Sequence, residues 1–235
     1  MSLTVRQSKI LEGVCQEFID SALPVSSQFL RGKLNFPFSS ATIRNEFGQL
    51  EKENYINHPY VSSGKIPTDK GFRFFVDEIM KEEGEGEKSK RSFFEELDSW
   101  DDFTRASYSL VEGIGSQCSG LVFGFFPSRE IVWKEGWEKI IKEPEFKDSN
   151  YPKTFLKAVN LLVENRDLLD WETGKIKIYI GRENPFYKAE ISLLVSEFSL
   201  PQEEKGRIAV LGPKRMDFKK NIRLLNSLLD FLEDF

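Results

Sequence analysis

The 235-residue chain is poor in the residues that build catalytic and metal sites. It has one histidine, His58, and no nucleophile–histidine pair, metal-ligand cluster, paired-carboxylate pattern or glycine-rich phosphate loop. The sequence therefore predicts no catalytic residue, no metal and no cofactor, and an enzyme is the least favoured class. Cys15 and Cys118 cannot form a disulfide framework. Both lie in apolar helical patterns, which favours buried free thiols over a disulfide or a metal site.

Long hydrophobic runs are also missing. No apolar stretch approaches the length that crosses a bilayer, and the first residues, MSLTVRQSKILEG, lack a signal-peptide core. A cytoplasmic protein with no membrane partner is the expectation. The 40% hydrophobic content fits an ordinary globular protein, and the length suffices for one large domain or two small ones.

The net charge of −5 argues against a nucleic-acid partner, but the charge is unevenly distributed. Residues 1–80 hold nine basic and nine acidic side chains, so the remainder carries the whole negative charge. Residues 24–75 hold seven basic side chains against four acidic ones. This modest basic balance is consistent with a DNA-binding protein that needs two copies to hold its site.

Composition divides the chain into two modules. Residues 81–92, KEEGEGEKSKRS, are charged and contain no apolar side chain, as in a linker. A solvated helix extension is less favoured, because Gly84 and Gly86 both disfavour helix. We expect an N-terminal domain at residues 1–80, a charged linker at 81–102 and a second domain at 103–235.

The N-terminal module begins with two helical patterns. Residues 4–21 place apolar side chains on one stripe, formed by Ile10, Leu11, Val14, Cys15, Phe18 and Ile19. Pro24 and Ser26 start a second, short helix that contributes Phe29, Leu30 and Leu34 to the core. Residues 35–38 form a turn, after which Ser39 is a good N-cap for a third helix.

The third helix has two distinct faces at about 100° per residue. Ile43, Phe47 and Leu50 cluster on one side and should pack on the first two helices. The opposite side comprises Ala41, Asn45, Gly48, Gln49 and Lys52, flanked by Thr42 and Arg44. Two explanations of Gly48 carry equal weight: a bare surface that lets the helix approach DNA, or a tight contact with a neighbouring helix.

Several side chains here have the chemistry of DNA contacts. Arg44 can pair bidentately with guanine, and Asn45 or Gln49 can do the same with adenine. The helix N-terminus suits a phosphate. The predicted phosphate contacts are Ser39, Ser40, Thr42, Lys65 and Lys70, with Lys52 as a further DNA-binding candidate. A solvated polar face would be preferred for one isolated helix, but the elements on either side favour DNA.

A short hairpin and a fourth helix follow. Tyr55 and Ile56 begin a strand, residues 62–64 turn, and residues 65–66 return. Thr68 caps a helix whose core side carries Phe72, Phe75, Val76 and Ile79. A surface or packing contact is favoured over a DNA contact for His58. This order of helix, hairpin and helix is typical of a winged helix-turn-helix DNA-binding domain.

Specific strings of this region resemble a known family. They are ATIRN at 41–45 and GKIPTDKGFRF at 64–74, supported by shorter matches at Leu3-Thr4, Arg6-Gln7 and Pro24-Val25. Further matches are PEF at 144–146, YIGREN at 179–184 and GRIAVLGPKRMDF at 206–218. Together they resemble the bacterial heat-inducible transcription repressor family HrcA.

The resemblance implies a dimeric repressor of heat-shock chaperone genes that binds a CIRCE-type inverted repeat of double-stranded DNA. It also implies a GAF-like second domain that mediates dimerisation and a GroEL-type chaperonin partner that helps keep the repressor active. Two departures stand out. Lys65 replaces the usual arginine, which keeps the charge but loses the bidentate fork. Only residues 127–136 remain where the family carries a long stretch of sheet and an inserted subdomain.

The second module predicts an α+β domain on a largely antiparallel sheet, here a reduced GAF-like domain. Helices are expected at 103–119, 137–142, 152–169 and 217–233, and strands at 121–126, 131–134, 176–180, 191–199 and 206–212. The first and last helices are candidates for a dimer seam, with packing inside the domain an equal competitor.

For two other features of the second module, a structural role is favoured over ligand binding. Residues 181–184 are favoured as a charged turn over an anion site. The phenylalanines are favoured as core over a ligand cage: Phe93, Phe94, Phe103, Phe123, Phe125 and Phe126. The alternative to the repressor function is a small-molecule or partner-sensing regulator with an altered DNA target, which a buried pocket with convergent polar groups would favour.

Overall fold

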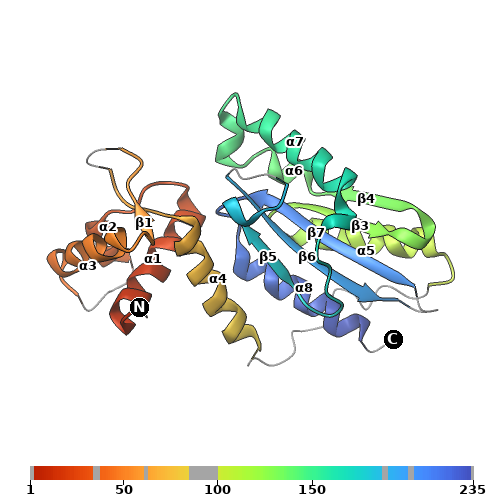
Figure 1. Cartoon of the computed structure of the whole chain (residues 1–235), viewed down its shortest axis with the longest axis horizontal. Coiled ribbons are helices and arrows are strands. Elements are labelled where there is room, and N and C mark those ends of the chain that lie inside the picture. The colour runs from red at the N-terminus through yellow and green to blue at the C-terminus, as the bar shows by residue number, and fades with distance from the viewer. Residues whose placement is uncertain are drawn as a thin grey trace. The chain divides into compact units, whose positions relative to one another are not determined.

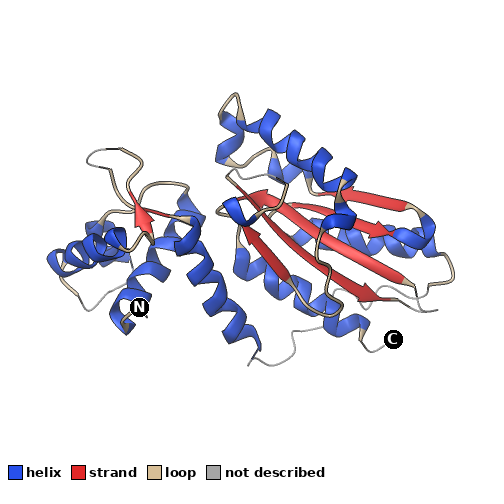
Figure 2. Cartoon of the chain, viewed as in Figure 1, coloured by secondary structure: helices blue, strands red, loops and turns tan. Residues whose placement is uncertain are grey.

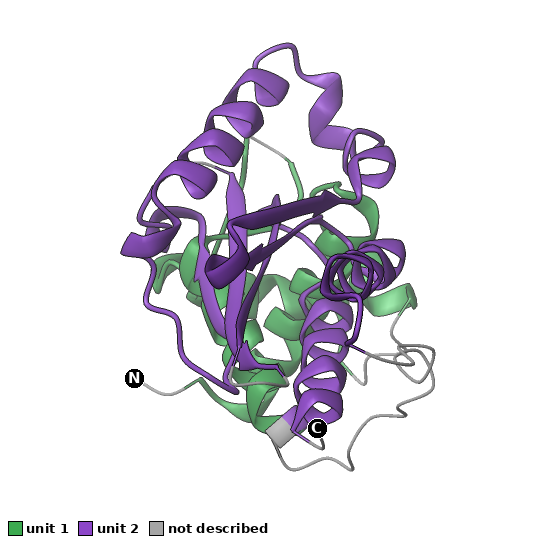
Figure 3. Cartoon of the chain, turned by 90° about the vertical axis from the view of Figure 1, so that its right-hand side faces the viewer, with its two compact units in different colours: residues 1–82 green, residues 83–235 purple. Residues whose placement is uncertain are grey.

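The computed structural model (Figure 1) describes residues 3–33, 38–60, 63–84, 100–186, 190–200 and 204–233. The chain divides into two compact units, Met1–Glu82 and Glu83–Phe235, which Figure 3 colours separately. Each unit is described by itself. The predictions for Leu34, residues 35–37, Ser62, Phe93, Phe94 and the linker between 85 and 99 lie outside the described residues.

Three helices open the N-terminal unit: α1 (Val5–Ser21), α2 (Ser27–Lys33) and α3 (Ser40–Lys52). A reciprocal capping box starts α1, because the Gln7 N–H donates to the Thr4 hydroxyl and the Thr4 N–H donates to the Gln7 side chain. The predicted stripe of α1 is buried at Ile10, Leu11, Val14, Cys15 and Ile19. The prediction for Phe29 is wrong. Its side chain is 47% exposed, because Leu30 takes the inward position on this short helix.

A small β-structure follows α3. Strands β1 (Ile56–Asn57) and β2 (Ile66–Pro67) pair antiparallel, so the predicted hairpin is present. Val25 extends it, since its N–H and C=O each form a 2.8 Å hydrogen bond with the backbone of Lys65. Gly64 lies against the same segment, where a β-carbon would come 2.6 Å from the Pro24 carbonyl carbon. We call β1 and β2 the ribbon.

Helix α4 (Asp69–Gly84) follows β2, and the residue before it, Thr68, contacts the backbone of Asn54 and Tyr55 just after α3. Thr68 caps α4 as predicted, accepting from the Gly71 N–H at 3.1 Å while its hydroxyl donates to the Asn54 carbonyl at 2.7 Å. A β-carbon on Gly71 would overlap the Tyr55 carbonyl oxygen. The glycine thus allows the two segments to approach. The helix runs to Gly84, four residues into the segment expected to be a linker.

The C-terminal unit is a five-stranded antiparallel sheet with helices on both faces (Figure 2). The spatial order is β4 (Ile131–Glu135), β3 (Leu121–Phe126), β7 (Lys205–Pro213), β6 (Ile191–Ser199) and β5 (Lys177–Ile180). Helices α5 (Phe103–Gln117) and α8 (Phe218–Leu232) lie along one face. Helices α6 (Trp137–Ile140) and α7 (Tyr151–Glu164) lie on the other. The predicted antiparallel α+β architecture is confirmed.

Both faces of the sheet carry a packed core. On the α7 side it includes Leu121, Phe123, Phe125, Phe155, Ile191, Leu193, Val195, Ala209 and Leu211. On the other side α5 and α8 bury Val111, Ile114, Ile222, Leu225 and Leu228. Packing inside the unit therefore accounts for the apolar faces that were candidates for a dimer seam. No helix within the described residues is both long and apolar enough to cross a membrane.

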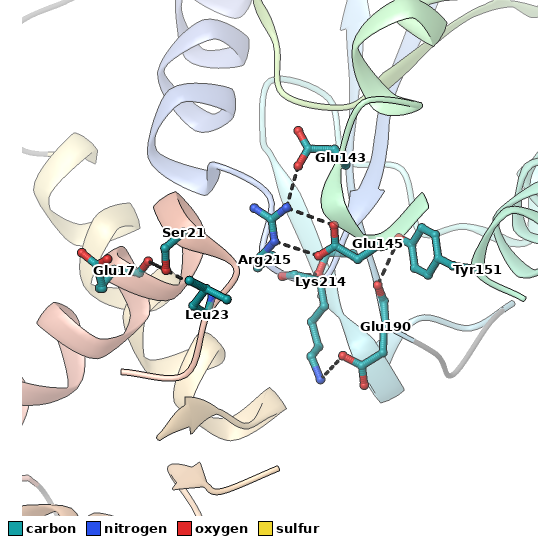
Figure 4. Close-up of polar contacts among 10 residues, drawn as sticks. Glu17, Ser21, Leu23, Glu143, Glu145, Tyr151, Glu190, Lys214 and Arg215 are labelled. Carbon is teal, nitrogen blue, oxygen red and sulfur yellow. Dashed lines mark hydrogen bonds and ion pairs between the residues drawn. The ribbon is translucent and has the colours of Figure 1, made fainter. Parts of the chain in front are cut away.

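A buried arginine ties two segments of this unit together (Figure 4). Arg215, between β7 and α8, is 7% exposed and donates to both oxygens of Glu145, at 2.7 and 3.0 Å. It also donates to Glu143 Oε2 at 2.6 Å. Beside it, Lys214 pairs with Glu190 at 2.7 Å. Two strings of the family resemblance, at 144–146 and 206–218, thus meet in space through a bidentate ion pair.

Candidate nucleic-acid interface

One side of α3 is exposed and polar, at the spacing predicted. Ile43, Phe47 and Leu50 are buried on the inner side, with exposures of 0%, 4% and 0%. The residues exposed on the outer side are Ala41, Arg44, Asn45, Gln49 and Lys52. Within the described residues, no ion pair or side-chain hydrogen bond engages Arg44, Asn45 or Gln49. These planar polar groups are therefore available to a molecule outside the chain.

Gly48 lies in the middle of this outer face. A β-carbon built there meets nothing within 4 Å among the described residues. The explanation by a tight contact with a neighbouring helix is therefore wrong for this part of the chain. Gly48 instead leaves a strip of bare backbone between Asn45 and Gln49, where another molecule could approach the helix closely.

The predicted phosphate contacts at the start of α3 form a helix cap. Ser39 Oγ accepts from the Thr42 N–H at 3.1 Å, and the Ser39 and Thr42 hydroxyls lie 2.9 Å apart. Ser39 is exposed, while Ser40 and Thr42 are partly buried. The cap satisfies one backbone donor of the first turn. Phosphate binding by these three residues stays a prediction.

The ammonium groups of Lys65 and Lys70 have partners within the chain. Lys65 Nζ donates to Glu51 Oε2 at 2.7 Å, and its side chain is only 17% exposed. Lys70 Nζ donates to the Glu53 carbonyl at 2.8 Å and lies 4.0 Å from the centroid of the Tyr55 ring. Lys70 thereby satisfies a free carbonyl at the C-terminal end of α3. The geometry gives both lysines structural roles, and their phosphate contacts stay predictions.

Two glutamates of α3 have roles that were not predicted from the sequence. Glu46 is 7% exposed and pairs with Arg6 of α1. Glu51 accepts from Lys65 and also lies 2.5 Å from Nδ1 of His58, which is the surface contact expected of that histidine. The hydrogen bonds from Lys65 and then from His58 hold the pKa of Glu51 below its ordinary value.

These pairings change the charge of the outer face. Glu46 and Glu51 are each paired with a cation, whereas no described acidic residue pairs with Arg44 or Lys52. Glu53 at the C-cap also has no described ion pair, so two unpaired positive charges stand against one negative charge. The face is therefore locally positive in a chain of net charge −5. A positive, polar helix face with planar amide and guanidinium groups fits the edges and backbone of duplex DNA.

Comparisons with known proteins found a matching family model and named relatives. Residues 92–222 match the family model described as HrcA protein C terminal domain. A Chloroflexus aurantiacus protein named heat-inducible transcription repressor HrcA is 43% identical over 105 residues, which is 42% of this chain and 28% of that protein. The protein of the same name from Chlorobium limicola is 24% identical over 345 aligned positions, covering 98% of this chain and 96% of that one.

That second alignment is longer than this 235-residue chain, so the Chlorobium protein carries segments with no counterpart here. A solved structure described as a hypothetical protein is similar over 99% of this chain and 98% of its own, with a TM-score of 0.82 and 19% identity. At that identity the similarity shows the fold alone.

Proposed function

Because this chain belongs to the HrcA family, we propose that it is a sequence-specific DNA-binding repressor of transcription. In this proposal the N-terminal unit is a winged helix-turn-helix domain, with α3 as its recognition helix and the ribbon as the base of its wing. One observation carries it. Arg44, Asn45 and Gln49 share one exposed face of α3, without described partners, opposite a face that is buried.

Each exposed group has a distinct part in the proposed complex. Arg44 donates two hydrogen bonds to a guanine edge, and Asn45 or Gln49 makes the paired contact to adenine. The capped N-terminus with Ser39, Ser40 and Thr42 meets one phosphate, and Lys52 meets another at the far end of the helix. The base contacts give sequence specificity and the phosphate contacts fix the orientation of the helix.

One recognition helix makes few base contacts, which supports a two-copy assembly. We propose a homodimer that binds a CIRCE-type inverted repeat controlling heat-shock chaperone genes, since a symmetric operator mirrors a two-fold symmetric protein. The names of the relatives support the heat-shock role. A cytoplasmic location, a GroEL-type chaperonin partner, and a GAF-like dimerisation and regulatory domain at 103–235 belong to the same proposal and rest on the family resemblance.

A small-molecule sensor was the alternative, and the described core does not favour it. The space between the sheet and α7 holds Phe123, Phe125 and Phe155, which are all buried and belong to one packed cluster. Aromatic side chains occupy the place where a ligand between these layers would sit.

Fluorescence anisotropy with a labelled CIRCE-type inverted repeat and a scrambled duplex of equal composition tests the proposed function. Wild-type protein should prefer the inverted repeat. Arg44→Ala should cost about 1–3 kcal/mol in binding and relax the preference at one base position. Lys9→Ala, which removes an exposed charge from α1, is the matched control and should change little. Equal wild-type affinity for both duplexes would overturn the proposal.

A further inference from the structure

We propose that Glu51 is a positioning residue that fixes the ribbon on the recognition helix, so that both elements dock on DNA as one body. This inference rests on the proposed DNA-binding function and deepens it. It assigns a role to an acidic residue that was predicted neither as a base contact nor as a phosphate contact.

The two oxygens of Glu51 engage opposite sides of the ribbon. Glu51 lies in the last turn of α3. Its Oε1 is 2.5 Å from Nδ1 of His58, the residue after β1, and its Oε2 is 2.7 Å from Nζ of Lys65, the residue before β2. One carboxylate therefore holds both strands of the ribbon to the helix that carries Arg44, Asn45 and Gln49.

Lys65 is fixed at its backbone as well as at its side chain. Its N–H donates to the Val25 carbonyl and its carbonyl accepts from the Val25 N–H, both at 2.8 Å. The ion pair with Glu51 thus links α3 to the segment that leads into α2. Because the side chain is 17% exposed and its ammonium is paired, Lys65 anchors the ribbon and is not a freely extended phosphate contact.

Charge repulsion and a positioning role predict opposite effects of Glu51 on DNA binding. A carboxylate near DNA is repelled by phosphates, so removing its charge should tighten the complex. If Glu51 positions the ribbon, removing its charge releases Lys65 and His58 and weakens the complex. The sign of the change separates the two explanations.

The variants are Glu51→Gln, Lys65→Met, the double variant, and Glu53→Gln as a matched control. Glu53 lies at the same end of α3, and its carboxylate has no ion pair with a described residue. Salt-dependent anisotropy with the inverted repeat is the measurement. Glu51→Gln should weaken specific binding about tenfold, as for the loss of a charged hydrogen-bond pair. Glu53→Gln should bind as tightly as wild type or more tightly.

The salt slope and the double variant identify the role of Lys65. Log K falls as log salt rises, and loss of a phosphate contact makes this negative slope shallower by about 1. Loss of a positioning residue leaves the slope unchanged. The double variant should bind DNA no more weakly than the weaker single variant, because both changes break the same Glu51–Lys65 ion pair. Two results would overturn the inference. One is a shallower salt slope in Lys65→Met, and the other is Glu51→Gln binding DNA as tightly as Glu53→Gln.

Amide hydrogen exchange in the free protein provides a readout that needs no DNA. Glu51→Gln should speed exchange of the Lys65 and Val25 amides, which bridge the ribbon to the segment before α2. Glu53→Gln should not. If wild-type protein shows no preference for the operator, the proposed function is wrong. If amide exchange is unchanged in Glu51→Gln, the positioning role is wrong even when operator binding is specific.

Discussion

The two units differ in what they do with their polar side chains. On α3 of the N-terminal unit, Arg44, Asn45 and Gln49 have no described partners and face solvent. In the C-terminal unit the buried Arg215 is satisfied internally, between Glu143 and Glu145. Unpaired polar groups on a rigid helix are suited to recognising a partner, whereas paired and buried ones specify a fold. The comparison supports the proposed recognition role of the first unit.

Each unit also contains one buried thiol, which allows the comparison to be tested unit by unit. Burial raises the pKa of Cys15 well above its ordinary value, and it raises the pKa of Cys118 to about 11. Both thiols are therefore protonated at neutral pH and shielded in the folded protein, so they should react slowly with a disulfide reagent. Each should become reactive when its own unit opens.

Arg215→Ala should give the largest effect and should affect the C-terminal unit alone. Removing the arginine leaves Glu143 and Glu145 without their shared cation, and we expect a loss of about 3 kcal/mol in the free energy of unfolding. Urea denaturation measures the loss. Reaction of Cys118 should accelerate while that of Cys15 stays slow.

The control for this variant is Lys175→Ala, which removes a surface ion pair with Glu172 from the same unit. The Lys175 side chain is 76% exposed, so stability and both thiol rates should stay near wild type. If Arg215→Ala accelerated both thiols equally, the two units would not unfold separately and the comparison would break.

Gly71→Ala should reverse the pattern. Alanine usually stabilises a helix relative to glycine, but here its β-carbon would overlap the Tyr55 carbonyl oxygen. We expect a loss of about 2 kcal/mol from overpacking. The Cys15 thiol, whose Sγ lies 3.8 Å from the Gly71 carbonyl, should react faster while Cys118 remains protected. A Gly71→Ala variant as stable as wild type would contradict the close approach of α4 to the backbone at Tyr55.

Much of the fold follows from local sequence signals. The strands at 121–126 and 191–199 were predicted at their observed boundaries. The first has no polar side chain, because both of its faces are buried, and the second is mostly apolar with serines and one glutamate between the apolar residues. Helix starts at Thr4, Ser39 and Thr68 follow from capping chemistry. The inner and outer faces of α3 follow from helical periodicity alone.

The remaining features depend on pairing across long sequence distances. Periodicity shows that Glu51 lies near the end of a helix, but it gives no sign that Lys65 and His58 fold back onto its carboxylate. The same holds for Arg215, whose two glutamates are about 70 residues away in a separate turn. Short helices are a further weakness, since α2 has seven residues and its periodicity did not distinguish the exposed Phe29 from the buried Leu30.

Gly48→Ala has the smallest expected effect on stability and tests the recognition side of the comparison most directly. No described atom lies within 4 Å of the added methyl group, so the variant should gain about 1 kcal/mol in the free energy of unfolding from helix propensity. Operator affinity should fall severalfold if DNA approaches the bare backbone, because the methyl group then occupies the contact.

Gly32→Ala in α2 is the matched control, since its β-carbon also meets no described atom within 4 Å. It should stabilise the unit similarly without changing operator affinity. A fall in affinity confined to Gly48→Ala would show that α3 meets DNA at its bare strip, with Asn45 and Gln49 reading on either side. Equal affinity in both variants would mean that the side chains reach the bases while the helix backbone stays clear of the groove floor. Neither the fold nor the DNA complex would then require a glycine at position 48.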